Sequence, residues 1–198
     1  MSVYWWGLFG LVFLWSAVNP KDYFTWGLEA APAVIAALLL LTTRRRFPFS
    51  PLVYWLILAH AIILMVGGHY TYAEVPLFDW LGRELGWERN NYDKVGHFAQ
   101  GFVPAIVARE IIVRHSVLAR QSWLNFVVVA ICLAISACYE LIEWWVAVAT
   151  GDSAVAFLGT QGYEWDTQSD MALALAGAVG ALVLLGSIHD RQLLRFKQ

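Results

Sequence analysis

Several apolar stretches of the chain are long enough to cross a lipid bilayer, and this feature constrains the fold more than any other. A helix needs about 20 apolar residues to span the hydrocarbon core of a membrane. Inside that core the backbone must satisfy its own hydrogen bonds, which leaves only helices and closed barrels. In a chain of 198 residues that is 60% hydrophobic, these stretches predict an all-α, polytopic membrane helix bundle. We expect a single transmembrane domain over residues 1–198.

Six apolar stretches are expected to form transmembrane helices. Asn19-Pro20, the run Arg44–Arg46 and Ser50-Pro51 mark several of their boundaries. Between the third and fourth helices, the segment from Leu77 to Trp87 has charged residues interleaved with apolar ones, which is typical of a short amphipathic helix in the membrane interface. The six predicted helices cover residues 3–18, 24–41, 51–68, 92–113, 123–149 and 167–188.

The distribution of charge predicts how the chain is oriented. Of the 13 Lys and Arg residues, nine lie on the side that holds both termini. The positive-inside rule therefore places both termini in the cytoplasm of a bacterial inner membrane. Of the 15 acidic residues, only Glu110 and Asp190 fall on that side. The basic residues follow the topology, so they do not indicate nucleic-acid binding.

Three pairs of ionisable residues lie at the outer ends of the fourth, fifth and sixth predicted helices. Spacings of three or four residues place both members of a pair on one face of a helix. Ionisable side chains in lipid are costly and usually face a bundle interior, a cavity or a bound ion. The pairs are Asp93/His97, Glu140/Glu143 and Asp166/Asp170. At one depth on three helices, they predict a single polar site that faces the periplasm.

Each pair also has a simpler structural explanation. Asp93 could cap its helix while His97 forms a hydrogen bond inside the bundle. Asp166 suits the first turn of a helix, where the helix dipole favours a carboxylate. Glu140 and Glu143 could form interhelical hydrogen bonds. Two adjacent buried carboxylates nevertheless need a shared proton or a nearby cation.

The histidines outside these pairs have different expected roles. His69 follows Gly67-Gly68, which would let the chain leave the third helix sharply and place His69 at the outer mouth of the site. His60 lies deeper in that helix and is expected to be a hydrogen-bonded core residue. His115 and His189 are expected to be solvated on the cytoplasmic side.

The predicted site has the donor types of a divalent metal centre. Mixed oxygen and nitrogen ligands without thiolate suit Zn, Mn or Fe, whereas an all-oxygen subset would suit Ca or Mg. Glu140 is the candidate general base and His97 the second candidate catalytic residue. Lys94 is the nearest cationic side chain by depth, and Glu29 could face the same cavity. The predicted metal ligands are His69, Asp93, His97, Glu143, Asp166 and Asp170.

Four sequence stretches resemble the YjdF-type family of bacterial inner-membrane proteins. They are Gly67-Gly68-His69-Tyr70-Thr71-Tyr72, Glu88-Arg89-Asn90-Asn91-Tyr92-Asp93, Tyr139-Glu140-Leu141-Ile142-Glu143-Trp144-Trp145 and Gly159-Thr160-Gln161-Gly162. The resemblance implies an inner-membrane location and no particular activity. The segment Asp93-Lys94-Val95-Gly96-His97-Phe98 is more distantly similar to VanZ-like membrane proteins, which are linked to resistance to glycopeptide antibiotics.

The predicted site leaves three functions open. The first is a metal-dependent hydrolase or transferase that acts on a membrane lipid or another cell-envelope substrate. The second is an ion- or proton-coupled transporter in which the acids relay ions, although such groups usually lie near the bilayer midplane. The third is a non-catalytic membrane scaffold with a structural ion. The oligomeric state cannot be predicted, because no G-x-x-x-G pattern dominates a helix face.

Overall fold

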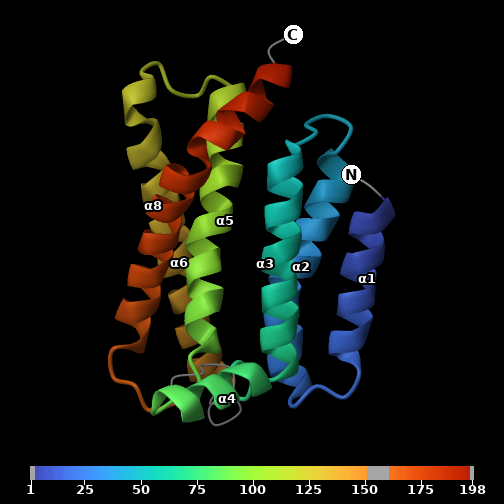
Figure 1. Ribbon diagram of the computed structural model, residues 1–198, viewed down its shortest axis with the longest axis vertical. Helices are drawn as coiled ribbons and strands as arrows, with labels where there is room; N and C mark the ends of the chain where they lie inside the picture. Colours follow the sequence, from blue (N-terminus) through green and yellow to red (C-terminus); the bar gives the residue numbers. More distant parts are fainter. Residues whose placement is uncertain (1–2, 151–160, 197–198) are drawn as a thin grey trace.

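The computed structural model describes residues 3–150 and 161–196. Six of the described helices run side by side, α4 lies across one end of the bundle, and both chain termini lie at the other end (Figure 1). The described residues contain no β-strand, so the predicted all-α class is confirmed. The helices are α1 (Val3–Ala17), α2 (Tyr23–Thr43), α3 (Pro51–His69), α4 (Pro76–Leu85), α5 (Tyr92–Arg114), α6 (Leu124–Thr150) and α8 (Asp166–Leu193), and the short 3-10 helices are η1 (Gln121–Trp123) and η3 (Leu194–Phe196).

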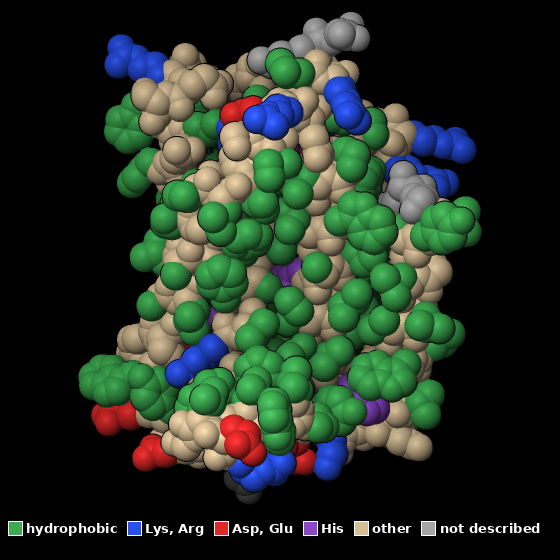
Figure 2. All heavy atoms as spheres, in the orientation of Figure 1, with side chains coloured by type: hydrophobic (Ala, Val, Ile, Leu, Met, Phe, Trp, Pro, Cys, Tyr) green, Lys and Arg blue, Asp and Glu red, His purple; other side chains and the backbone are tan. Residues whose placement is uncertain are grey.

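Four of the described helical segments are long and apolar enough to cross a membrane. They are Tyr23–Thr43, Pro51–His69, Gln121–Thr150 and Asp166–Phe196. The helix α1 is apolar but only 15 residues long, and α5 has 23 residues but carries several charged side chains. Hydrophobic side chains cover the middle of the face drawn in Figure 2, and most acidic side chains on that face lie at the α4 end.

Local sequence explains several helix ends. The Asp22 side chain accepts a hydrogen bond from the Thr25 N–H at 2.6 Å and caps α2. Ser50 caps α3 in the same way, and Pro51 occupies its first turn. Gly86 adopts a left-handed conformation (φ 68°) and ends α4.

The helix α3 continues through Gly67-Gly68 and ends one residue later, at His69, so the two glycines do not form a sharp exit from the helix. The two glycines instead allow close packing inside the bundle. A Cβ atom on Gly67 would overlap the Tyr72 ring, and one on Gly68 would lie 3.0 Å from the Cβ of Glu29. The double glycine therefore makes room for two side chains of the candidate site.

The bundle consists of two groups of three helices, α1–α3 and α5, α6 and α8, which meet where α3 packs against α5 (Figure 1). The closest approach is between α5 and α8. A Cβ atom on Gly101 would overlap the backbone carbonyl of Ala174, and one on Gly177 would overlap that of Phe98. Small residues at such contacts let helix backbones come together, as is common for helices in membranes.

A buried network of charges ties α5 to α8 at the end with the termini. Glu110 and His189 are both fully buried, and their carboxylate and imidazole lie 2.9 Å apart. Arg109 donates to His189 Nδ1 at 3.0 Å and to Asp190 at 2.7 Å. Arg114 donates to Glu110 at 2.9 Å. The expectation that His189 is solvated was therefore wrong, whereas His115 is exposed as predicted.

Candidate functional site

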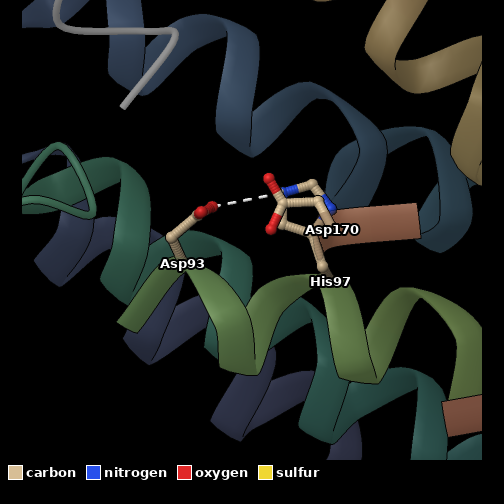
Figure 3. A group of neighbouring side chains, drawn as sticks. All are labelled: Asp93, His97 and Asp170. Atoms are coloured by element: carbon tan, nitrogen blue, oxygen red, sulfur yellow. Dashed lines mark ion pairs between the residues drawn. The ribbon is translucent and has the colours of Figure 1, made fainter. Parts of the chain in front are cut away.

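Asp93, His97 and Asp170 converge at the α4 end of the bundle (Figure 3). His97 lies one turn after Asp93 on α5, and Asp170 lies in the second turn of α8. The Nε2 atom of His97 is 3.2 Å from Oδ1 of Asp93 and 3.7 Å from Oδ2 of Asp170. One donor atom from each residue lies within 4.8 Å of the other two, and all three residues are at most 9% exposed. We call these three residues the acidic triad.

The contact between Gly101 and Ala174 positions the acidic triad. Gly101 lies four residues after His97, and Ala174 lies four residues after Asp170. Gly101 therefore lies one helical turn after His97 on the same face of α5, and Ala174 lies one turn after Asp170 on the same face of α8. Because neither helix carries a bulky side chain at this contact, the imidazole and the carboxylate come within reach of each other.

Neighbouring side chains hold the atoms of the triad that point away from its centre. Arg89 contacts Asp93 Oδ2 at 3.4 Å, and Ser169 contacts Asp170 Oδ1 at 3.4 Å. The Nδ1 atom of His97 lies 3.2 Å from the side-chain oxygen of Gln100. Metal-binding histidines and carboxylates are commonly oriented by outer partners of this kind. The arrangement leaves His97 Nε2, Asp93 Oδ1 and Asp170 Oδ2 facing one another.

Glu140 reaches the triad from α6. Its Oε1 atom lies 3.8 Å from His97 Nδ1. The residue is 9% exposed, and none of the residues that the structure describes donates a hydrogen bond to its buried Oε1. A buried carboxylate oxygen without a donor is costly, so this atom is suited to accept a proton from a ligand.

Asp166 belongs to an ion pair beside the triad. Its carboxylate lies 2.5 Å from Arg89, which also contacts Asp93. Arg89 therefore supplies the positive charge next to these acids. Lys94, which the sequence suggested for that role, lies over the Tyr163 ring, with Nζ 5.4 Å from its centroid.

A cavity of about 150 Å³ extends from the triad toward α2 and α3. Among residues 3–150 and 161–196, its lining has the three carboxylates of Glu29, Asp93 and Glu143 and no Lys or Arg. Tyr139 on α6 donates a hydrogen bond to Glu29 on α2 at 3.2 Å and so joins these two helices across the cavity. We call this space the polar chamber. The expectation that Glu29 faces the cavity is confirmed.

The structure does not bring two of the histidines considered above into the triad. His69 lies at the end of α3, where its Nδ1 is 3.0 Å from the Ser16 carbonyl oxygen of α1 and its ring packs on Trp15. His60 lines the polar chamber. No hydrogen bond to His60 is found among residues 3–150 and 161–196, so the expected hydrogen-bonded core role is not seen.

Sequence reasoning missed Arg89, Gln100 and Gly101 as parts of the site. Arg89 precedes Asp93 by four residues, which is a recognisable ion-pair spacing. Gln100 follows His97 by three residues and could have been found from the same helical periodicity. No pattern within one segment predicts that Gly101 meets Ala174, because that contact depends on how α5 and α8 pack.

Comparison with known proteins places the chain in a family. A family described as "Predicted membrane protein (DUF2238)" matches residues 1–191. The chain belongs to the DUF2238 family. It is 53% identical over 186 residues to the inner membrane protein YjdF of Escherichia coli (strain K12). The aligned residues make up 94% of this chain and 89% of that relative.

The match to YjdF confirms the first resemblance found in the sequence. No solved structure matches this DUF2238 chain. The comparisons do not bear on the VanZ-like similarity, which stays a prediction.

Proposed function

We propose that this chain is an inner-membrane protein with six transmembrane helices and both termini in the cytoplasm. Four helical segments have the length and hydropathy of membrane spans, and α1 and α5 lie alongside them in the same bundle (Figure 1). The excess of Lys and Arg on the side with the termini supports the orientation. The relative's description as an inner membrane protein supports the location. The acidic triad then faces the periplasm.

We propose that the acidic triad binds a divalent metal ion. The observation that carries this proposal is the convergence of three buried donor atoms, one nitrogen and two oxygens, within 4.8 Å of one another. Zn, Mn and Fe fit this donor set best. Asp166 and Glu143 lie nearby as further carboxylates, although Asp166 already pairs with Arg89.

The function that this geometry supports best is metal-dependent hydrolysis or group transfer on a lipid or other cell-envelope substrate. A bound cation would polarise a phosphoryl or carbonyl oxygen and acidify a bound water. Glu140 would accept the proton of that water or of an acceptor hydroxyl. The attacking oxygen then forms the new bond to the phosphorus or carbon, the ester bond breaks, and Glu140 returns the proton to the leaving oxygen.

The position of α4 favours a substrate from the membrane. Leu77, Trp80 and Leu85 are each at least 50% exposed on this helix. Buried Asn90 holds α4 beside the start of α5 through hydrogen bonds to Val75 and Asp79. An amphipathic helix with exposed apolar side chains, held beside the start of α5, suits contact with lipid headgroups.

The proposed activity can be tested in vesicles of phosphatidylethanolamine and phosphatidylglycerol. Purified protein would be incubated with Zn²⁺ or Mn²⁺, and lipid products would be identified by mass spectrometry. We expect Glu140→Gln to keep the metal and lose turnover, and His97→Ala to lose both. Metal content and turnover that stay unchanged in His97→Ala and Glu143→Ala would contradict the proposal.

A further inference from the structure

An apolar groove of about 530 Å³ lies between α2, α3 and α5, in the half of the bundle nearer the termini. Its lining is almost wholly hydrophobic and includes Ala36, Ile57 and Val107. Leu39 and Ile111, on its two sides, are 58% and 39% exposed, so the groove is open along the surface of the bundle. It ends near Phe47 and His115.

The apolar groove continues the polar chamber. Four residues line both spaces: Pro32, His60, Leu64 and Pro104. In the α4 half of the bundle, α6 closes the space through the Tyr139–Glu29 hydrogen bond and forms the chamber. The lining of the groove includes no residue of α6, and the groove is apolar. One space therefore changes from acidic to hydrophobic along its length.

The length and lining of the groove suit a hydrocarbon chain. From Val103 on α5 to His115, which follows the end of that helix, the groove spans about 18 Å at 1.5 Å per residue. Burying each methylene group of an alkyl chain against this apolar lining is favourable.

We propose that the apolar groove holds the hydrocarbon chain of a membrane lipid whose phosphate-bearing head occupies the polar chamber. This assignment deepens the proposed function, because the metal at the acidic triad would supply the positive charge that a phosphate needs beside three carboxylates. From Asp93 to Ile111, chamber and groove extend about 27 Å along α5. The ligand is therefore an amphiphile with one long chain that passes His60 between the two spaces.

Hexadecyl phosphate is a suitable probe, with native mass spectrometry of the full-length protein in detergent as the measurement. Ala36→Trp would fill the groove, and Ile35→Trp is its matched control, because Ile35 is 56% exposed on the same helix and is not part of the lining. We expect wild type and Ile35→Trp to retain the probe and Ala36→Trp to lose at least about tenfold of it. Equal retention in Ala36→Trp, or no retention in wild type, would overturn the groove assignment.

Octyl phosphate keeps the test independent of how well Ala36→Trp folds. The eight additional methylene groups of hexadecyl phosphate should raise retention by wild type at least about tenfold over octyl phosphate. Equal retention of both alkyl phosphates would overturn the assignment. Metal content measured on the same samples separates the two proposals. Retained hexadecyl phosphate without any metal would support the groove as the site of the alkyl chain. It would contradict both the placement of the phosphate beside the three carboxylates and the metal-dependent function.

Discussion

The two ends of the α5–α8 helix pair both bury charged side chains, but they balance the charge differently. At the end with the termini, Glu110 accepts hydrogen bonds from Arg114 and from the Ser50 N–H and contacts His189. Arg109 connects this group to Asp190. Each of these charged groups therefore has a partner of opposite charge or a hydrogen-bond donor.

At the α4 end, α5 and α8 together with α6 and α2 hold an excess of acid. Asp93, Asp170 and Glu140 surround His97, and Glu29 and Glu143 line the adjoining chamber. Arg89 pairs with Asp93 and Asp166 at the edge of this group. An unbalanced buried cluster is unfavourable unless a cation or protons are bound. The comparison suggests that the balanced end stabilises the fold and the unbalanced end binds a ligand.

The largest effect on stability is expected at the balanced end. Glu110→Ala would leave His189 and Arg114 without their shared carboxylate and should lower the free energy of unfolding by about 3–5 kcal/mol. Denaturant unfolding in detergent, followed by tryptophan fluorescence, would measure the loss. Asp190→Ala is the control, because this carboxylate is 62% exposed and should contribute less than about 1 kcal/mol. A stability loss for Glu110→Ala no larger than that of the control would contradict the comparison.

The helix contact below the acidic triad should connect stability with metal binding. Gly101→Val would force α5 and α8 apart, costing about 1–3 kcal/mol and separating His97 from Asp170. Metal content and unfolding would be measured on the same preparation. Gly180→Ala is the matched control, since its added Cβ would meet only ordinary contacts at 3.9 Å and 4.0 Å. Full metal content in Gly101→Val would refute this positioning role.

Removing a carboxylate at the unbalanced end should not lower the free energy of unfolding, in contrast to Glu110→Ala. In metal-free buffer, Asp170→Asn removes one of several mutually repelling acids, so we expect unchanged stability or a gain of up to about 1 kcal/mol. Adding Zn²⁺ should stabilise wild type and leave this variant unchanged. Metal-free Asp170→Asn that unfolds as easily as Glu110→Ala would show that both ends have the same structural role.

The smallest effect is expected at the exposed ion pair between Lys21 and Glu74, whose charged atoms lie 2.9 Å apart. The Glu74 carboxylate raises the pKa of the Lys21 ammonium. Any contribution to stability is therefore present at neutral pH and lost only as the pH rises through the lysine range. Because the pair is exposed, we expect Lys21→Ala to leave the melting temperature at pH 7 unchanged. A clear decrease in the melting temperature would mean that the Lys21–Glu74 ion pair contributes more to stability than its exposure indicates.

The sequence predicted where the long helices lie, because apolar length and capping residues act locally. The predicted end of the sixth helix at residue 188 was wrong, since α8 continues to Leu193. The predicted boundaries of α5, residues 92–113, differ from the structure by one residue. Helical spacing also predicted that Asp93 and His97 share a face, which the 3.2 Å contact confirms. Both features depend only on residues within one helix.

Contacts between helices were harder to predict. His69 was placed at the site because it lies near the right depth, but depth alone does not show which neighbour it faces, and it contacts Ser16 on α1. Glu110 and His189 are 79 residues apart, and no local pattern indicates that they meet. The relation between Glu140 and Glu143 also depends on tertiary packing, since Glu140 approaches His97 while Glu143 lines the chamber.

Elemental analysis of purified protein tests the central claim most directly. Wild type, His97→Ala, Asp170→Asn and His69→Ala would be prepared in parallel and supplemented with Zn²⁺, Mn²⁺ or Fe²⁺. We predict near-stoichiometric metal in wild type and in His69→Ala, whose imidazole lies outside the triad, and loss of the metal in the other two variants. Wild type without metal after supplementation, or equal metal in all four proteins, would contradict the account.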